Sequence, residues 1–144
     1  MFLIYLFVAT ACIVCGMAFN GTMPYFLDAP SLCIVLIPST TLTVASYGWG
    51  NVRRAFSISD HVENPDTLHK TAASFGMNCV WFGILSMLIG AVKILALWNE
   101  IDSADQIAPA ASVMLLPLTY GLCFHALFAK PFADRWQKAI HSAE

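Results

Sequence analysis

The sequence predicts an all-α integral membrane protein with four transmembrane helices in a single domain, residues 1–144. Hydrophobic residues make up 58% of the chain and charged residues only 11%, whereas soluble domains carry roughly 25% charged residues. Four runs with few or no charges lie at residues 2–19, 31–47, 72–98 and 107–129. Since about 20 apolar residues cross a bilayer, each run is predicted to be one span, and little is left for a soluble domain.

The first span, residues 2–19, has a length that suits either a transmembrane helix or a signal peptide. A signal peptide needs a positively charged start, and no Lys or Arg precedes Arg53. We therefore expect this span to be kept as a helix. The second span, residues 31–47, contains Pro38, which frees the carbonyl of Ile34 from its helical partner. A hydroxyl-rich run follows it directly, so a modestly polar zone is predicted there.

Residues 48–71 form the longest polar stretch of the sequence. The run Asn64-Pro65-Asp66-Thr67 favours a turn over a continuing helix. We therefore expect a short cytoplasmic loop with one short amphipathic turn.

Basic residues predict the orientation in the membrane, because Lys and Arg prefer the cytoplasmic side. They flank the inner ends of spans two, three and four: Arg53, Arg54, Lys70, Lys130, Arg135 and Lys138. The connections at residues 20–30 and 99–106 hold acidic residues and no basic residue. With four crossings, both termini are predicted to lie in the cytoplasm.

Span three carries a stripe of small residues, which we call the small-residue seam. Its residues are spaced by four and three, so they lie on one face of a helix: Ala72, Gly76, Cys79, Gly83, Ser86 and Gly90. In lipid, such residues let another backbone approach closely. The seam is therefore predicted to pack either against a helix of the same chain or against a helix of another polypeptide. Lys93 continues this face near the outer end, where its stem can reach the interface.

Span four has a less uniform stripe, formed by Ser112, Leu116, Thr119, Cys123 and Ala126. Pro117 frees the carbonyl of Val113, which must find another donor in lipid. Thr119, Thr41 and Ser86 are the candidate donors. His125 lies about one turn from Lys130, and it is either a packing histidine or a group that titrates at a gate.

Several functions find no support in the sequence. No Asp or Glu lies within a predicted span, so the chain alone lacks the carboxylates of a proton relay. No metal-ligand cluster, catalytic triad or phosphate loop is present in the pattern, and we expect neither an enzyme nor a bound cofactor. The net charge of −2 argues against a nucleic-acid partner.

Two blocks of the sequence resemble the MotA/TolQ/ExbB family of proton- and sodium-channel proteins, in particular its MotA/PomA-like stator subunits. In the first block, Asp28, Pro30 and Ser31 match an F-x-D-x-P-S signature at the start of the second helix. The second block covers helices three and four, with an I-x-P-A start, a Y-G pair and a P-x-A-D exit. Its matching residues are Pro109, Tyr120, Gly121, Pro131, Ala133 and Asp134.

The resemblance implies a homopentamer in a bacterial inner membrane. Its third and fourth helices would surround two copies of a single-span partner of MotB/ExbD type, which carries the transmembrane aspartate. Flow of H⁺ or Na⁺ would drive rotation or work on the envelope. The implied partner-facing seam is Gly76, Cys79, Gly83, Ser86 and Gly90. On helix four, the implied pore face is Ser112, Pro117, Thr119, Tyr120 and Gly121.

The sequence also departs from the family pattern. The large cytoplasmic domain of the flagellar stator subunits is missing, and Met87 stands where the third helix usually has threonine. The threonine pair of the fourth helix falls on Pro117 and Leu118, so Ser86 and Thr119 are the remaining candidate ion-path hydroxyls. Three alternatives follow: an ion-conducting motor subunit, a non-conducting membrane scaffold of the same fold, and an unrelated four-helix membrane protein.

Overall fold

A computed structural model describes residues 28–57, 64–97 and 104–141, together with a few positions near the N-terminus (residues 7, 8, 10–12 and 15). The elements in these three ranges are all helical: α3 (Ala29–Tyr47), α4 (Trp49–Ala55), α5 (Pro65–Ala96), α6 (Ala104–Cys123), the π-helix η2 (Phe124–Ala129) and α7 (Lys130–His141). Three segments are long and apolar enough to cross a membrane: Ala29–Tyr47, Pro65–Ala96 and Ile107–His141. The all-α class is confirmed, and these segments indicate a membrane protein. Apart from the few positions named above, the predicted span at residues 2–19 lies outside the described residues.

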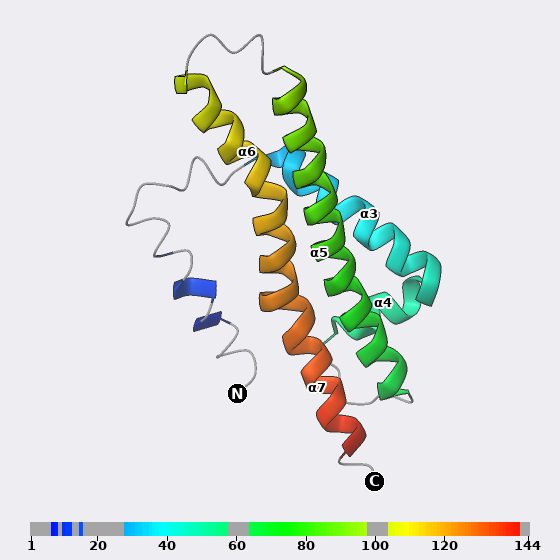
Figure 1. The fold of residues 1–144 in the computed structure, drawn as a ribbon. Helices are drawn as coiled ribbons and strands as arrows, with labels where there is room; N and C mark the ends of the chain where they lie inside the picture. Colours follow the sequence, from blue (N-terminus) through cyan, green and yellow to red (C-terminus); the bar gives the residue numbers. More distant parts are fainter. Residues whose placement is uncertain are drawn as a thin grey trace.

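Helix α5 is the centre of the described structure, because it contacts α3, α4, α6, η2 and α7. Figure 1 shows α5 beside the continuous column of α6, η2 and α7, with α3 running obliquely along the other side of α5. Helix α3 begins beside the middle of the α5–α6 pair and not at the end where α5 finishes and α6 starts. The backbone N–H of Asp28 donates to the hydroxyl of Tyr120 (3.2 Å), and Tyr120 lies about 24 Å along the column from Ala104.

Helix α3 begins and ends at residues that suit helix termini. The carboxylate of Asp28 accepts hydrogen bonds from the backbone N–H and the hydroxyl of Ser31, which satisfies a donor that the first turn leaves free. Pro30 occupies the first turn, where its missing N–H is not needed. At the other end, Gly48 has φ 80°, a backbone conformation that residues other than glycine rarely adopt.

The hydroxyls of α3 bond to their own helix. Ser39 donates to the carbonyl of Val35 (2.6 Å), Thr41 to that of Ile37 (2.8 Å) and Thr43 to that of Ser39 (2.7 Å). Thr41, one of the three candidate donors for the carbonyl of Val113, therefore bonds within α3 instead. The physical reason is that a Ser or Thr hydroxyl in a helix reaches the carbonyl four residues earlier without any change of backbone.

Among the described residues, the predicted loop at residues 48–71 contains two helical segments. Helix α4 is the short amphipathic turn that we expected, and α5 begins at Pro65, seven residues before the predicted start of span three. The predicted turn at Asn64-Pro65-Asp66-Thr67 is therefore wrong from Pro65 onward. Proline is favoured in the first turn of a helix, so the pair marks the start of α5.

The fourth predicted span also extends further than expected. Helix α6 starts at Ala104, and the helical path continues without a break through η2 into α7, which ends at His141. In η2 the backbone N–H of Lys130 bonds to the carbonyl of His125, five residues earlier, so this turn holds more residues than an α-helical turn. The charged segment that follows the predicted span at residues 107–129 is thus an amphipathic helix, which buries Phe132, Ala133 and Trp136.

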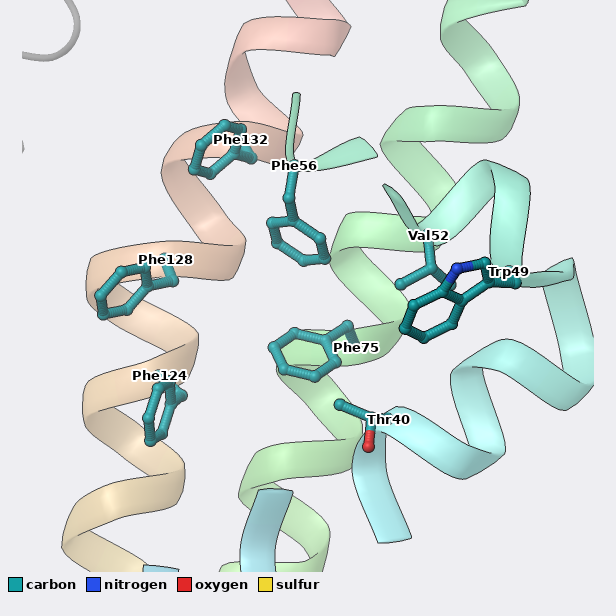
Figure 2. A pocket seen from close by; sticks show the side chains of 8 residues that line it. All are labelled: Thr40, Trp49, Val52, Phe56, Phe75, Phe124, Phe128 and Phe132. Carbon is teal, nitrogen blue, oxygen red and sulfur yellow. The ribbon is translucent and has the colours of Figure 1, made fainter. Parts of the chain in front are cut away.

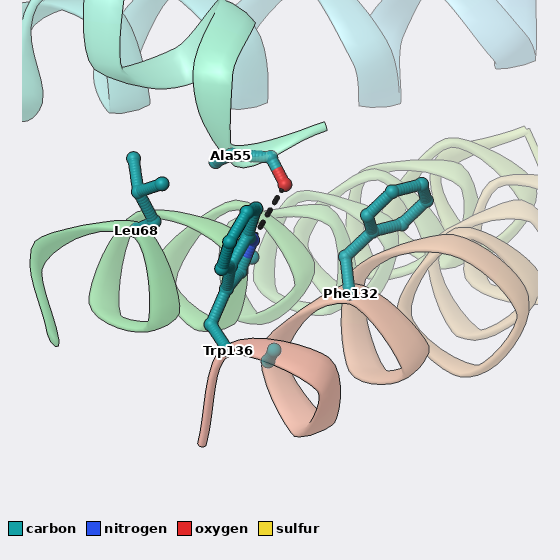
Figure 3. Close-up of a cluster of buried hydrophobic side chains, with 6 residues drawn as sticks. Ala55, Leu68, Phe132 and Trp136 are labelled. Carbon is teal, nitrogen blue, oxygen red and sulfur yellow. Dashed lines mark hydrogen bonds between the residues drawn. The ribbon is translucent and has the colours of Figure 1, made fainter. Parts of the chain in front are cut away.

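These buried residues join α4 and α5 in a hydrophobic cluster, which we call the tryptophan cluster: Ala55, Leu68, Ala72, Phe132, Ala133 and Trp136. Figure 3 shows the indole of Trp136 lying between Leu68 and Phe132. The indole N–H donates to the carbonyl of Ala55 (2.8 Å), and a nitrogen of His69 lies 2.8 Å from the carbonyl oxygen of Ala133. The cluster thereby fixes α4 and α7 against the first turns of α5.

Candidate functional site

The small-residue seam packs against the neighbouring helix of the same chain. A Cβ added at Gly83 would lie 2.7 Å from the carbonyl oxygen of Pro117, and one added at Gly90 would lie 2.9 Å from the side chain of Met114. In return, Gly121 leaves room for the carbonyl of Cys79. Backbones can approach this closely only where no side chain stands between them.

Within the described chain, the seam makes the first of the two predicted contacts, the one with a helix of the same chain. Gly76, Cys79 and Gly83 are buried, because the antiparallel column of α6 and η2 fills the groove that these small residues create. A contact of the seam with a partner stays a prediction. Ser86 and Gly90, nearer the C-terminal end of α5, are only partly buried.

The two candidate ion-path hydroxyls do not meet in one site. Ser86 lines a hollow of about 640 Å³ between the start of α3, the C-terminal half of α5 and the N-terminal half of α6, together with Ser31 and Lys93. Thr119 lies outside this hollow, and its hydroxyl donates to the carbonyl of Leu115 (3.1 Å). Thr119, one of the three candidate donors for the carbonyl of Val113, therefore bonds elsewhere.

The remaining residues of the predicted helix-four face point in different directions. Pro117 and Gly121 are buried towards α5. Ser112 is exposed and donates to the carbonyl of Ala108 (2.9 Å). Tyr120 accepts the hydrogen bond from Asp28. The predicted pore face therefore falls into two groups. Pro117, Tyr120 and Gly121 contact other helices. The hydroxyls of Ser112 and the partly buried Thr119 bond to carbonyls of α6 itself.

His125 lies in η2 and occupies the space that Gly76 leaves open. Its Nδ1 would be 2.6 Å from a Cβ added at Gly76. This nitrogen is buried and has no hydrogen-bond partner in the described part of the chain. The contact agrees with a packing histidine, and the titrating role stays a prediction.

Sequence reasoning missed a second hollow, which we call the phenylalanine hollow. It has a volume of about 490 Å³, and its main lining residues are Trp49, Phe56, Phe75, Phe124, Phe128 and Phe132. Figure 2 shows three of these rings stacked along η2 and α7, facing Phe56, Phe75 and Trp49 across the hollow. The regular spacing of Phe124, Phe128 and Phe132 was the available signal. It could not be interpreted without knowing that α4 folds back towards these residues.

The described residues contain no group of three or more His, Cys, Asp or Glu side chains that could hold a metal ion. The five cysteines are free thiols. Lys70 and Asp66 form an exposed ion pair (2.6 Å) along α5.

No protein-family model matches the sequence, and no curated protein matches it. In the described residues, the candidate site consists of the α5–α6 hairpin, the oblique helix α3 and the two hollows beside them.

Proposed function

We propose that the chain is a membrane subunit of an ion-driven assembly of the MotA/TolQ/ExbB type. Five copies would surround two copies of a single-span partner that carries a transmembrane aspartate, in a bacterial inner membrane with both termini in the cytoplasm. Flow of H⁺ or Na⁺ through this assembly would be coupled to rotation or to work on the cell envelope.

The observation that carries the proposal is the hydrogen bond between Asp28 and Tyr120. Asp28 belongs to the first block of the family resemblance and Tyr120 to the second, 92 residues later. Next to Tyr120, Gly121 packs against the backbone of α5, where a Cβ would overlap the carbonyl of Cys79. Residues that carry the resemblance in two distant parts of the sequence thus form one structural unit, as expected if the resemblance reflects a shared fold.

The packing also changes which surface a partner would contact. Because Gly76, Cys79 and Gly83 are used within the hairpin, the partner would contact a face that the hairpin leaves uncovered. The exposed residues Met77, Trp81, Leu88 and Val92 of α5 share a face opposite the seam, so this face points away from α6. On α6, Leu115 and Leu122 are exposed, with Thr119 on the same face. We propose that the α6 face meets the partner, which makes Thr119 the candidate hydroxyl on the partner-facing surface.

Imaging and co-purification test the assembly. We expect five copies of the chain around an axis filled by helices of a second, single-span protein. An empty axis, or a monomeric or dimeric particle, would contradict this proposal and favour an unrelated four-helix membrane protein.

Ion flux tests conduction. The pentamer with its partner, reconstituted in liposomes, should lose most of its H⁺ or Na⁺ flux on Thr119→Ala or Ser86→Ala, because each removes a hydroxyl that can accept or pass on the ion. Thr41→Ala is the matched control, since Thr41 is exposed on α3 and makes the same type of bond to its own helix. Equal flux in all three variants would show that these hydroxyls do not form the path.

A non-conducting scaffold of the same fold is the second candidate function. The observation that favours it is that Ser86 and Thr119 do not face a common site within the chain. On this alternative the pentamer and its partner assemble normally, but liposomes that contain them show no flux above protein-free liposomes.

A further inference from the structure

The phenylalanine hollow has the character of a preformed apolar binding site. The Phe56 ring packs edge-on against Phe75 and Phe132, with ring centroids 5.2 and 5.5 Å apart. The hydroxyl of Thr40, which also lines the hollow, donates to the carbonyls of Leu36 and Ile37. The hollow therefore offers an occupant almost only hydrocarbon surface, and its volume lies in the range of small-ligand sites.

The spacing of residues along α4 places a cation beside this hollow. Trp49 and Val52 on α4 and Phe56 directly after it line the hollow, and Arg53 lies four residues after Trp49 and three before Phe56. Residues at these spacings are neighbours on a helix surface, so Arg53 belongs to the hollow side of α4. It is exposed, as is Arg54 next to it, which lies on a different side of the helix.

The rim also has the composition of a membrane interface. Trp49 is 68% exposed, and tryptophan is enriched where the hydrocarbon of a bilayer meets the headgroups. Arg53 follows it at the same end of the transmembrane bundle. An occupant must therefore have a long apolar part for the phenylalanine rings and a negative charge within reach of Arg53.

We propose that the phenylalanine hollow binds an anionic glycerophospholipid of the surrounding leaflet. One acyl chain lies between Phe75 and the Phe124–Phe128 rings, and the phosphate pairs with Arg53. The apolar lining explains the preference for an acyl chain over a polar ligand. The arginine at the rim explains the preference for an anionic lipid over a zwitterionic lipid. This inference does not depend on ion conduction by the assembly.

A photoreactive side chain at the hollow tests the proposal. Phe128, 40% exposed, is replaced by benzoylphenylalanine in the full-length protein, which is reconstituted in phosphatidylcholine bilayers that contain a minor fraction of phosphatidylglycerol. After irradiation, mass spectrometry identifies what is attached to residue 128. We expect phosphatidylglycerol adducts well above the fraction of that lipid in the bilayer.

Charge variants sharpen the result. Arg53→Gln should lower the phosphatidylglycerol adduct about fivefold, which corresponds to the attraction of one basic residue to an anionic leaflet. Arg54→Gln is the matched control and should leave the adduct unchanged. Thermal unfolding of each variant shows whether the fold is kept. Adducts in proportion to the bilayer composition, equal effects of the two arginines, or attachment to residues 2–19 or to a second copy of the chain would each overturn the proposal.

Discussion

The small-residue seam packs α5 against α6, whereas the tryptophan cluster packs α4 and α7 against α5, and the two contacts are built by opposite means. In the seam, glycines bring backbone against backbone, as at Gly83 and Pro117. In the tryptophan cluster, large side chains fill the space, and the indole of Trp136 bonds to the carbonyl of Ala55. Both contacts are closely packed, but only the tryptophan cluster is filled by large side chains.

The difference follows from the solvent on each side. Lipid solvates leucine as well as a protein core does, so bulky apolar residues gain little by meeting each other within a bilayer, and close backbone packing replaces them. Outside the hydrocarbon, water restores the gain from burying an aromatic ring. The change from glycines to Trp136 along α5 and the column of α6, η2 and α7 is therefore the change expected if α7 lies outside the hydrocarbon.

The largest effect that we predict is at the seam. In Gly83→Leu, the new side chain would overlap the backbone of Pro117, and backbone cannot move aside as a side chain can. We expect loss of most folded protein in detergent, measured by thermal unfolding and size-exclusion chromatography. Gly50→Leu is the control, because a Cβ at Gly50 meets no atom within 4 Å. A stable Gly83→Leu protein would mean that α5 and α6 do not touch here.

The tryptophan cluster should respond to loss of volume instead. Trp136→Ala removes a ring that is 3% exposed and should lower the free energy of unfolding by about 3–5 kcal/mol. Trp136→Phe keeps an aromatic ring but leaves the Ala55 carbonyl without its donor, so it should lower the free energy of unfolding by about 1 kcal/mol. Denaturant unfolding in mixed micelles measures both. If the two variants were equally stable, ring volume would not be what holds α7 in place.

The contact between Asp28 and Tyr120 should have a smaller effect. Tyr120→Phe removes the acceptor of the Asp28 N–H and should lower the free energy of unfolding by about 0.5–1.5 kcal/mol. The same unfolding assay applies, with Tyr47→Phe as a comparison, since the Tyr47 hydroxyl reaches Ser74 at 3.3 Å. A neutral Tyr120→Phe variant would show that the start of α3 is held by other contacts.

The smallest effect is predicted for the ion pair of Lys70 and Asp66. Both side chains are more than 60% exposed, and exposed pairs of this spacing contribute little to stability because water and salt screen them. Lys70→Gln should therefore leave the unfolding midpoint almost unchanged at any salt concentration. A marked, salt-sensitive loss would indicate that this end of α5 is covered by another part of the protein.

The sequence was sufficient for the class, for three helices and for the face of α5 that packs closely. Periodicity identifies which residues share a face, but it does not identify the helix that covers them, so the partner of Gly76 and Gly83 had to come from the structure. The start at Pro65 was missed because the same Asn-Pro pair can end one helix or begin another. The phenylalanine hollow depends on Phe56 folding back from α4, and no local pattern encodes such a distant contact.

The π-turn of η2 contains one residue more than an α-helical path between the same ends would need. Deleting a single residue there would restore regular winding and keep α7 aimed as it is, so Trp136 would still face Ala55 and Phe132 would still face Phe56. Deleting one residue from a regular α-helical stretch of α6 would instead rotate everything after it by roughly 100°. The π-turn can therefore absorb a one-residue change in chain length without re-aiming the last helix, so related chains could gain or lose a codon there and keep the tryptophan cluster.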